Sequence, residues 1–179
     1  MPSYSGVWTL TAVYQAVGAG NWPANGPIGL FGGGGYRSNV IDKVIIPSTG
    51  NATDFGDLIT AGDARTGVGA CSSTTRGVFA GGDQTAVIQY VEFSTLGNAT
   101  TFGDLTVTRA YLAGCNSSTR GVFGGGWDGG SNLNTIDYIT IATTGNATTF
   151  GALTVARGEI AGCSSSTRGV LRVVELFPQ

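Results

Sequence analysis

The stretch GNATTFGDLTVTR at residues 97–109 decides the fold, because its first nine residues recur twice elsewhere in the chain. The copies begin 47 residues before it and 48 residues after it, and they read GNATDFGDL at 50–58 and GNATTFGAL at 145–153. A second motif accompanies the first: ACSSTTRGVFAGG at 70–82, GCNSSTRGVFGGG at 114–126 and GCSSSTRGV at 162–170. A fixed period of this length indicates a repeat architecture, in which neighbouring units bury one another's faces.

The segments between these motifs alternate apolar and polar residues, as β-strands do. The clearest example is TIDYITIAT at 135–143, with counterparts VIDKVIIPS at 40–48 and VIQYVEFST at 87–95. The third copy predicts four strands, from the inner to the outer one, near 111–115, 120–125, 135–143 and 148–155. No segment keeps a helical period. Four short strands per unit are typical of a propeller blade, so we expect an all-β fold of four-stranded antiparallel blades.

The repeat also predicts the domain organisation. We expect an N-terminal segment at 1–27, which attaches the protein or completes a blade, and a repeat domain at 28–179. Its units lie near 28–60, 67–107 and 110–155, with a partial unit at 158–177. About 3.5 blades do not close the usual ring of four to eight. Residues 7–17 could complete the last blade, several chains could close a ring or form a fibre, or the last strand could dock on another protein. We favour association or docking, because open strand edges attract partners.

Composition excludes several classes of function. The chain has no histidine, which removes the commonest general base and most zinc-enzyme sites. Nine Lys and Arg residues and a net charge of −2 predict no binding to nucleic acid. No apolar run reaches the roughly 18 residues that span a membrane, and the first residues lack a basic signal-peptide region. We therefore expect no membrane insertion, no signal peptide and no cofactor.

The order of the motifs resembles the kelch repeat, which has an apolar strand, Gly-Gly, a variable loop, an N-x-I-x-Y strand, an aromatic residue and L-T-x-x-R. In the third copy the matching residues are Val122, Phe123, Gly125, Gly126, Asn134, Ile136, Tyr138, Phe150, Leu153 and Arg157. The chain departs from kelch repeats where a Trp usually precedes the outer strand, since Phe55, Phe102 and Phe150 stand there. The resemblance implies kelch-like β-propeller repeats.

The opening SGVWTLTAVYQAV at 5–17, taken with the repeat, is similar to kelch-like structural proteins of tailed marine bacteriophages, notably those that infect cyanobacteria. This resemblance covers nearly the whole chain. It implies a virion protein of the phage tail or a tail fibre, made in the bacterial cytoplasm, with other virion proteins as partners. We expect a further role in host attachment through the variable loops.

Sequence differences between the copies concentrate in the loops that follow the Gly-Gly motif. Such loops suit recognition, because a fixed scaffold presents them. The candidate surface residues at their tips are Tyr36, Arg37, Asp83, Gln84, Trp127 and Asp128. Trp127 beside Asp128 could stack on a sugar ring and accept its hydroxyl protons, so a carbohydrate-binding module that recognises a host surface glycan is the alternative function. The competing interpretation is that Trp127 packs on its own or a neighbouring chain.

The remaining chemically capable residues recur in every unit, which favours a scaffold role over catalysis. They are Arg65, Arg109 and Arg157; Arg76, Arg120 and Arg168; Asp42, Gln89 and Asp137; and Cys71, Cys115 and Cys163. We interpret the cysteines as buried packing thiols, in preference to a metal site. Asp57 and Asp104 are the best pair for glycoside hydrolysis, but Ala152 replaces the carboxylate in the third copy. The Asn-Ala-Thr triplets are interpreted as turns whose Asn side chains bond backbone, in preference to glycosylation sites. We therefore predict no catalytic, cofactor-binding or metal-binding residue, and no enzyme.

Overall fold

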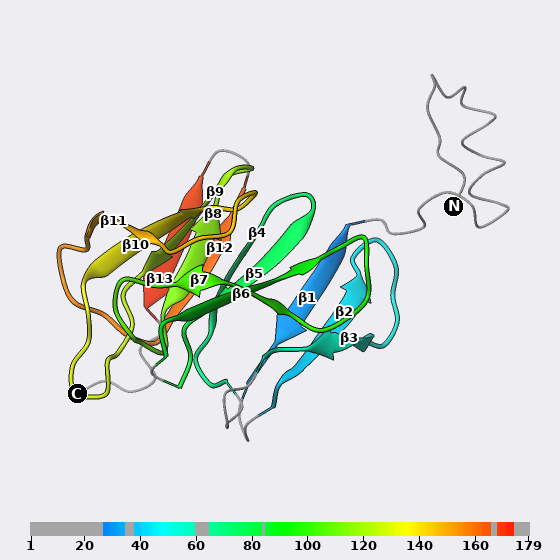
Figure 1. Cartoon of the computed structure of the whole chain (residues 1–179), viewed down its shortest axis with the longest axis horizontal. Coiled ribbons are helices and arrows are strands. Elements are labelled where there is room, and N and C mark those ends of the chain that lie inside the picture. The colour runs from blue at the N-terminus through cyan, green and yellow to red at the C-terminus, as the bar shows by residue number, and fades with distance from the viewer. Residues whose placement is uncertain (1–26, 35–37, 60–64, 84, 166–167, 174–179) are drawn as a thin grey trace, which may run out of the picture.

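The computed structural model describes residues 27–34, 38–59, 65–83, 85–165 and 168–173. In this part of the chain every regular element is a β-strand, and none of the described segments is a helix that could cross a membrane. The strands form four antiparallel sheets that follow one another along the chain (Figure 1). In each sheet the strands are hydrogen-bonded in sequence order, as in a meander.

Each sheet corresponds to one unit of the repeat. The first contains β1 (Ile28–Gly32), β2 (Val40–Ile45) and β3 (Thr53–Asp57). The second contains β4 (Gly69–Ser72), β5 (Arg76–Ala80), β6 (Val87–Glu92) and β7 (Thr100–Asp104). The third contains β8 (Ala113–Asn116), β9 (Arg120–Gly124), β10 (Thr135–Thr140) and β11 (Thr148–Ala152), and the last contains β12 (Ile160–Ser164) and β13 (Gly169–Val173).

The predicted four-stranded antiparallel unit is confirmed in the second and third sheets, and the strands of the third sheet are shorter than predicted for local reasons. The inner strand β8 begins after Tyr111, whose φ of 56° interrupts the extended backbone. The second strand β9 ends before Gly125, whose φ is 64°. The third strand β10 ends in a turn in which Thr143 N–H donates to the Thr140 carbonyl at 3.2 Å. Left-handed backbone and turns therefore set the strand ends.

The apolar core lies between successive sheets, because side chains alternate between the two faces of each strand. Between the first and second sheets it contains Ile41, Phe55, Leu58, Phe79, Val91 and Ala99. Between the second and third sheets it contains Cys71, Val78, Ala80, Ile88, Phe102, Leu105, Leu112, Phe123, Ile139 and Ile141. The second sheet thus buries one face against the first sheet and the other against the third.

The inner strands of neighbouring sheets approach so closely that glycine is required. A Cβ on Gly114 of β8 would collide with the carbonyl of Ala70 in β4, and a Cβ on Gly162 of β12 would collide with the carbonyl of Gly114. One strand further out, a Cβ on Gly121 would lie 2.5 Å from the Cys71 sulfur. The glycine that precedes each cysteine in β8 and β12, and the one in the Arg-Gly-Val motif, therefore leave room for a neighbouring sheet.

The Asn-Ala-Thr segments tie the outer strands of neighbouring sheets together. Asn98 Oδ1 accepts from the Asp57 N–H at 3.0 Å, and Asn146 Oδ1 accepts from the Asp104 N–H at 3.1 Å. On both sides of each Asn, the backbone N–H groups donate to carbonyls of the preceding outer strand. The Asn side chains do bond backbone, as expected, but the backbone belongs to the neighbouring sheet. The rims of the first and second sheets, and those of the second and third, are therefore hydrogen-bonded to each other.

Candidate functional site

Three of the six predicted surface residues, Tyr36, Arg37 and Gln84, lie outside the described residues. Asp83 is exposed in the turn after β5, with a left-handed φ of 46°. Its N–H donates to the Thr66 carbonyl at 3.0 Å, so the backbone of this turn is held against the segment that enters the second sheet.

The loop between β9 and β10 carries the other two candidates. Trp127 is half-buried, and its backbone exchanges hydrogen bonds with Ala110 at 2.8 and 2.9 Å. Asp128 is exposed, and its Oδ1 accepts from the N–H groups of Gly130 at 2.9 Å and Ser131 at 2.8 Å. These backbone donors lower the pKa of Asp128, because they stabilise the carboxylate. One carboxylate oxygen thus organises the loop itself.

Two residues that the sequence analysis did not single out, Tyr111 and Glu159, lie close to this loop. The Tyr111 and Trp127 rings are tilted by 53° with centroids 6.4 Å apart. Tyr111 and Glu159 have φ values of 56° and 53°, and the first full copy has Gly67 at the same position with φ of 73°. A left-handed non-glycine residue costs about 1–2 kcal/mol. In the sequence, the left-handed backbone at this position is indicated by the alignment of Tyr111 and Glu159 with Gly67.

A cavity of about 320 Å³ opens beside these residues, where the inner strands begin. It is lined by Gly67, Val68, Tyr111, Leu112, Glu159 and Ile160. Tyr111 is exposed, and the Glu159 carboxylate has no hydrogen-bond or ion-pair partner among the described residues. An aromatic face, an unpaired carboxylate and an aliphatic floor can accept a small ring that carries hydroxyl groups. We call this arrangement the Tyr111 shelf.

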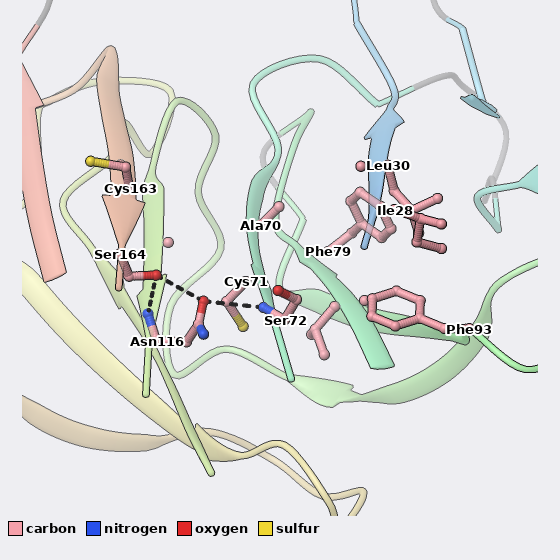
Figure 2. A pocket seen from close by; sticks show the side chains of 15 residues that line it. Ile28, Leu30, Ala70, Cys71, Ser72, Phe79, Phe93, Asn116, Cys163 and Ser164 are labelled. Carbon is pink, nitrogen blue, oxygen red and sulfur yellow. Dashed lines mark hydrogen bonds between the residues drawn. The ribbon is translucent and has the colours of Figure 1, made fainter. Parts of the chain in front are cut away.

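A second hollow, of about 250 Å³, lies between β1 and the inner strands (Figure 2). Ile28 and Leu30 of β1 line one side of it, and Ser72, Asn116 and Ser164 line the other. These three polar residues are already bonded to one another: Asn116 Oδ1 accepts from the Ser72 N–H at 3.2 Å and from Ser164 Oγ at 3.1 Å. The same hydroxyl accepts from the Asn116 N–H at 3.2 Å. These bonds link the inner strands β4, β8 and β12, so the three residues have a structural role and do not form a catalytic group.

The recurring arginine at the entry to each sheet is buried in the second and third sheets. Arg109 pairs with Asp137 at 2.9 Å, and both side chains are completely buried. Burial lowers the pKa of Arg109, and the nearby Asp137 carboxylate acts in the opposite direction. Asp137 also accepts from Thr106 Oγ1 at 2.6 Å and from its N–H at 3.2 Å. The pair therefore joins the third sheet to the end of the second, which is a scaffold role.

At the equivalent site in the second sheet, the amide of Gln89 takes the place of the carboxylate. Gln89 Oε1 accepts from the Ile59 N–H at 2.6 Å, and its amide donates to the Ile59 carbonyl at 3.4 Å. Arg65 donates instead to the carbonyls of Gly81 at 2.8 Å and Val87 at 3.2 Å. An isoleucine has no hydroxyl to donate, so an amide that both donates and accepts fits it better than a carboxylate. The two junctions are therefore chemically different.

The other repeated arginines also join strands and sheets. Arg76 contacts Glu92 at 2.7 Å within the second sheet and donates to the carbonyls of Ile141 at 3.1 Å and Ala142 at 2.8 Å in the third. Its guanidinium lies 4.6 Å from the centroid of the Tyr90 ring, and Arg120 lies 4.4 Å from that of Tyr138. Arg157, by contrast, is exposed and has no side-chain partner among the described residues.

The cysteines and carboxylates do not assemble into a reactive centre in the described part of the chain. Cys71 is buried, Cys115 is half-buried and Cys163 is exposed, so the expectation of three buried thiols holds for the first only. Burial, with a smaller contribution from Cys115, raises the pKa of the Cys71 thiol to about 12. Asp57 and Asp104 lie on the outer strands of different sheets. No group of three or more Cys, Asp or Glu side chains among the described residues could hold a metal ion.

Comparison of the chain with models of known protein families gives no match, and comparison with curated proteins gives none either.

Proposed function

We propose that this chain is a structural protein of a phage virion, a kelch-like propeller module of the tail or a tail fibre. Its role is assembly with other virion proteins and further copies of itself, with host-surface recognition through its loops. The virion location rests on the resemblance of residues 5–17 and of the repeat. The structural, non-catalytic role is supported by one observation above all: the recurring polar residues Arg65, Arg109 and Asp137 are buried at junctions between sheets.

The propeller form is supported by the arrangement of the inner strands. β4 lies against β8, and β8 lies against β12. The Gly114 and Gly162 contacts place these strands at closer range than ordinary sheet stacking allows. Inner strands that converge in this way are typical of blades around a propeller axis.

Mass spectrometry of purified phage particles tests the virion location. We expect peptides of the chain in particles that have passed two successive density gradients, at a constant ratio to the major tail protein. Antibody labelling viewed by electron microscopy should then mark the tail or its fibres. Peptides found only in the lysate of infected cells, and never in particles, would contradict the proposal.

A second function, binding of a host surface glycan, is favoured by the Tyr111 shelf. We expect a glycan array to give binders whose signal falls when Tyr111→Ala or Trp127→Ala removes a stacking ring, since such stacking supplies a large part of sugar binding energy. Phe150→Ala is the matched control, because Phe150 is an exposed aromatic residue on the outer strand β11. Equal loss in all three variants, or an array with no binder, would count against glycan recognition.

A further inference from the structure

One face of the first sheet exposes residues whose counterparts in the other sheets are buried or half-buried. Phe31 is 63% exposed, whereas Phe79 and Phe123, at the same repeat position, are 4% and 0% exposed. Ile46 is 63% exposed, whereas its counterpart Ile141 is 0% exposed. In the second and third sheets this face is covered by the preceding sheet. The first-sheet face, which comprises Gly29, Phe31, Asp42 and Ile46, has the composition of a covered face.

The last sheet exposes the opposite half of the same interface. Val170 of β13 is 56% exposed, whereas its counterpart Val78 is 0% exposed beneath the third sheet. Cys163 of β12 is exposed, whereas Cys71 is buried. Figure 2 shows the Cys163 sulfur pointing away from Asn116 and Cys71. We call Cys163, Val170 and Arg172 the last-sheet face.

The first specific match between the two faces is a contact between cysteine and glycine. This contact occurs at two described junctions. A Cβ on Gly121 of the third sheet would lie 2.5 Å from the Cys71 sulfur of the second, and a Cβ on Gly169 of the last sheet would lie 2.7 Å from the Cys115 sulfur of the third. Cys163 is the next cysteine in this series, and Gly29 is the counterpart of Gly121 and Gly169. A Cβ on Gly29 would meet only side chains of its own sheet. The last-sheet face therefore offers a sulfur, and the first-sheet face offers the space for it.

The second match concerns charge. At the existing junctions a small residue at the end of the second strand lies opposite a large apolar one: Gly32 opposite Phe79, and Gly124 opposite Leu171. In the last sheet the position of Gly32 and Gly124 is occupied by Arg172. In the first sheet the position of Phe79 and Leu171 is occupied by Phe31. Phe31 is paired directly with Asp42 across β1 and β2. An arginine placed over Phe31 can stack on the ring and donate to the Asp42 carboxylate.

Neither charged group is satisfied within the described residues. Asp42 is half-buried on β2 and Arg172 is exposed on β13, and neither side chain has a hydrogen bond or an ion pair in that part of the chain. The residue at the Asp42 position is bonded in the second sheet, as Gln89, and in the third sheet, as Asp137. Asp42 therefore lacks the kind of partner that its repeat position otherwise has.

We propose that the last-sheet face of one copy of this chain stacks on the first-sheet face of a second copy, head to tail, with Arg172 paired to Asp42. The two faces of one chain do not cover each other: Gly29 and Cys163 line the same hollow, but Phe31 and Val170 remain 63% and 56% exposed. A symmetric contact between two first-sheet faces would bring two Asp42 carboxylates together, which is unfavourable.

The head-to-tail contact also explains how a closed ring of sheets can form. A heterologous contact gives a closed ring when the rotation that relates successive copies adds up to a full turn. The four sheets formed by the described residues give eight sheets in two chains, which lies within the range of four to eight blades found in propellers. We therefore expect a dimer in which the same contact occurs twice. This inference deepens the assembly part of the proposed function and does not depend on a virion location.

Charge exchange tests the contact in the full-length chain. By sedimentation velocity, the wild type should dimerise, whereas Asp42→Arg alone and Arg172→Asp alone should lower the association constant by roughly 100-fold or more. An equimolar mixture of the two variants should recover dimers, because each contact then joins opposite charges. The double variant should recover dimers by itself. Asp104→Arg, which makes the same charge change on the exposed edge of β7, is the matched control and should dimerise as the wild type does.

A second readout follows the thiol. Dimer formation should slow the labelling of Cys163 by a maleimide, and the slowing should be absent in Asp42→Arg. Thermal unfolding of the variants shows whether each one folds, and recovery in the mixture rules out misfolding as the cause of any loss. A wild type that stays monomeric at all concentrations would overturn the proposal, as would single variants that dimerise normally. Particle mass spectrometry tests the virion location independently, so either proposal can fail alone.

Discussion

Replacing Asp137 by Asn is expected to destabilise the protein far more than replacing Gln89 by Ala, although both residues occupy the same repeat position. Asn has nearly the shape of Asp, but it leaves the guanidinium of Arg109 buried without a counter-charge. Breaking a completely buried ion pair in this way costs about 3–5 kcal/mol. Gln89→Ala removes two hydrogen bonds to the Ile59 backbone, which costs about 1–3 kcal/mol. Because a typical domain has only about 5–15 kcal/mol of stability, the first loss is a large fraction of the total.

Urea unfolding followed by circular dichroism measures both losses, with the slope of each curve as a check that the same surface unfolds. The double variant that combines Asp137→Asn with Arg109→Met removes both charges and gives the critical comparison. It should recover most of the stability lost in Asp137→Asn, because an apolar replacement of a buried pair is often neutral or stabilising. A loss of about 1 kcal/mol or less in Asp137→Asn would refute the reasoning. So would a double variant whose loss equals the sum of the single losses.

Three further predictions concern the contacts between sheets. Gly114→Ala should cost about 1–3 kcal/mol of unfolding free energy, because the new methyl group meets a carbonyl of the second sheet, whereas Gly151→Ala faces open space and should change it by about 0.5 kcal/mol or less. Asn146→Ala should speed amide hydrogen exchange at Asp104, whose N–H then loses its acceptor, and an unchanged exchange rate would show that this bond is not formed. The Cys71 thiol ionises near pH 9 when unfolded and near pH 12 when folded, so its contribution to stability is complete below pH 9 and is lost as pH rises toward 12. That loss should reach about 1.4 kcal/mol per pH unit and should be missing in Cys71→Ala; the same alkaline slope in both proteins would contradict it.

The sequence predicts the strands well because each strand is specified locally. The alternation in residues 135–143 and the glycines at 124–126 determine where a strand runs and where it must stop, and the same signals recur in every copy. The Gly125 and Gly126 N–H groups donate to the carbonyls of Thr135 and Arg157. The Gly-Gly motif therefore acts through backbone hydrogen bonds, and these recur in the second sheet.

The sequence cannot predict the environment of a residue whose neighbour differs between copies. Arg109 and Arg157 follow nearly identical motifs, yet Arg109 is buried against a carboxylate and Arg157 is exposed. The environment of such a side chain depends on the sheet that comes next, which the residue's own motif does not encode. The same argument explains the graded burial of the three cysteines.

The Tyr111 shelf was missed for a different reason. Tyr111, Trp127 and Glu159 belong to three separate segments, and only the backbone pairing of Ala110 with Trp127 brings the two rings together. The left-handed backbone at Tyr111 and Glu159 also runs against the preference of these residue types. An alignment of the copies with one another would have marked the position, because its first member is Gly67.

The Asn-Ala-Thr contacts bear on how a protein of this kind gains and loses units. The second unit carries both the acceptor that binds the unit before it, Asn98 Oδ1, and the donor that serves the unit after it, the Asp104 N–H, so a duplicate of this unit would meet compatible neighbours beside itself. Gene duplication could therefore lengthen the array without any new contact having to evolve. The junctions at Gln89 and Asp137 limit this freedom, since exchanging those two units would place a carboxylate beside an isoleucine and an amide beside an unpaired arginine.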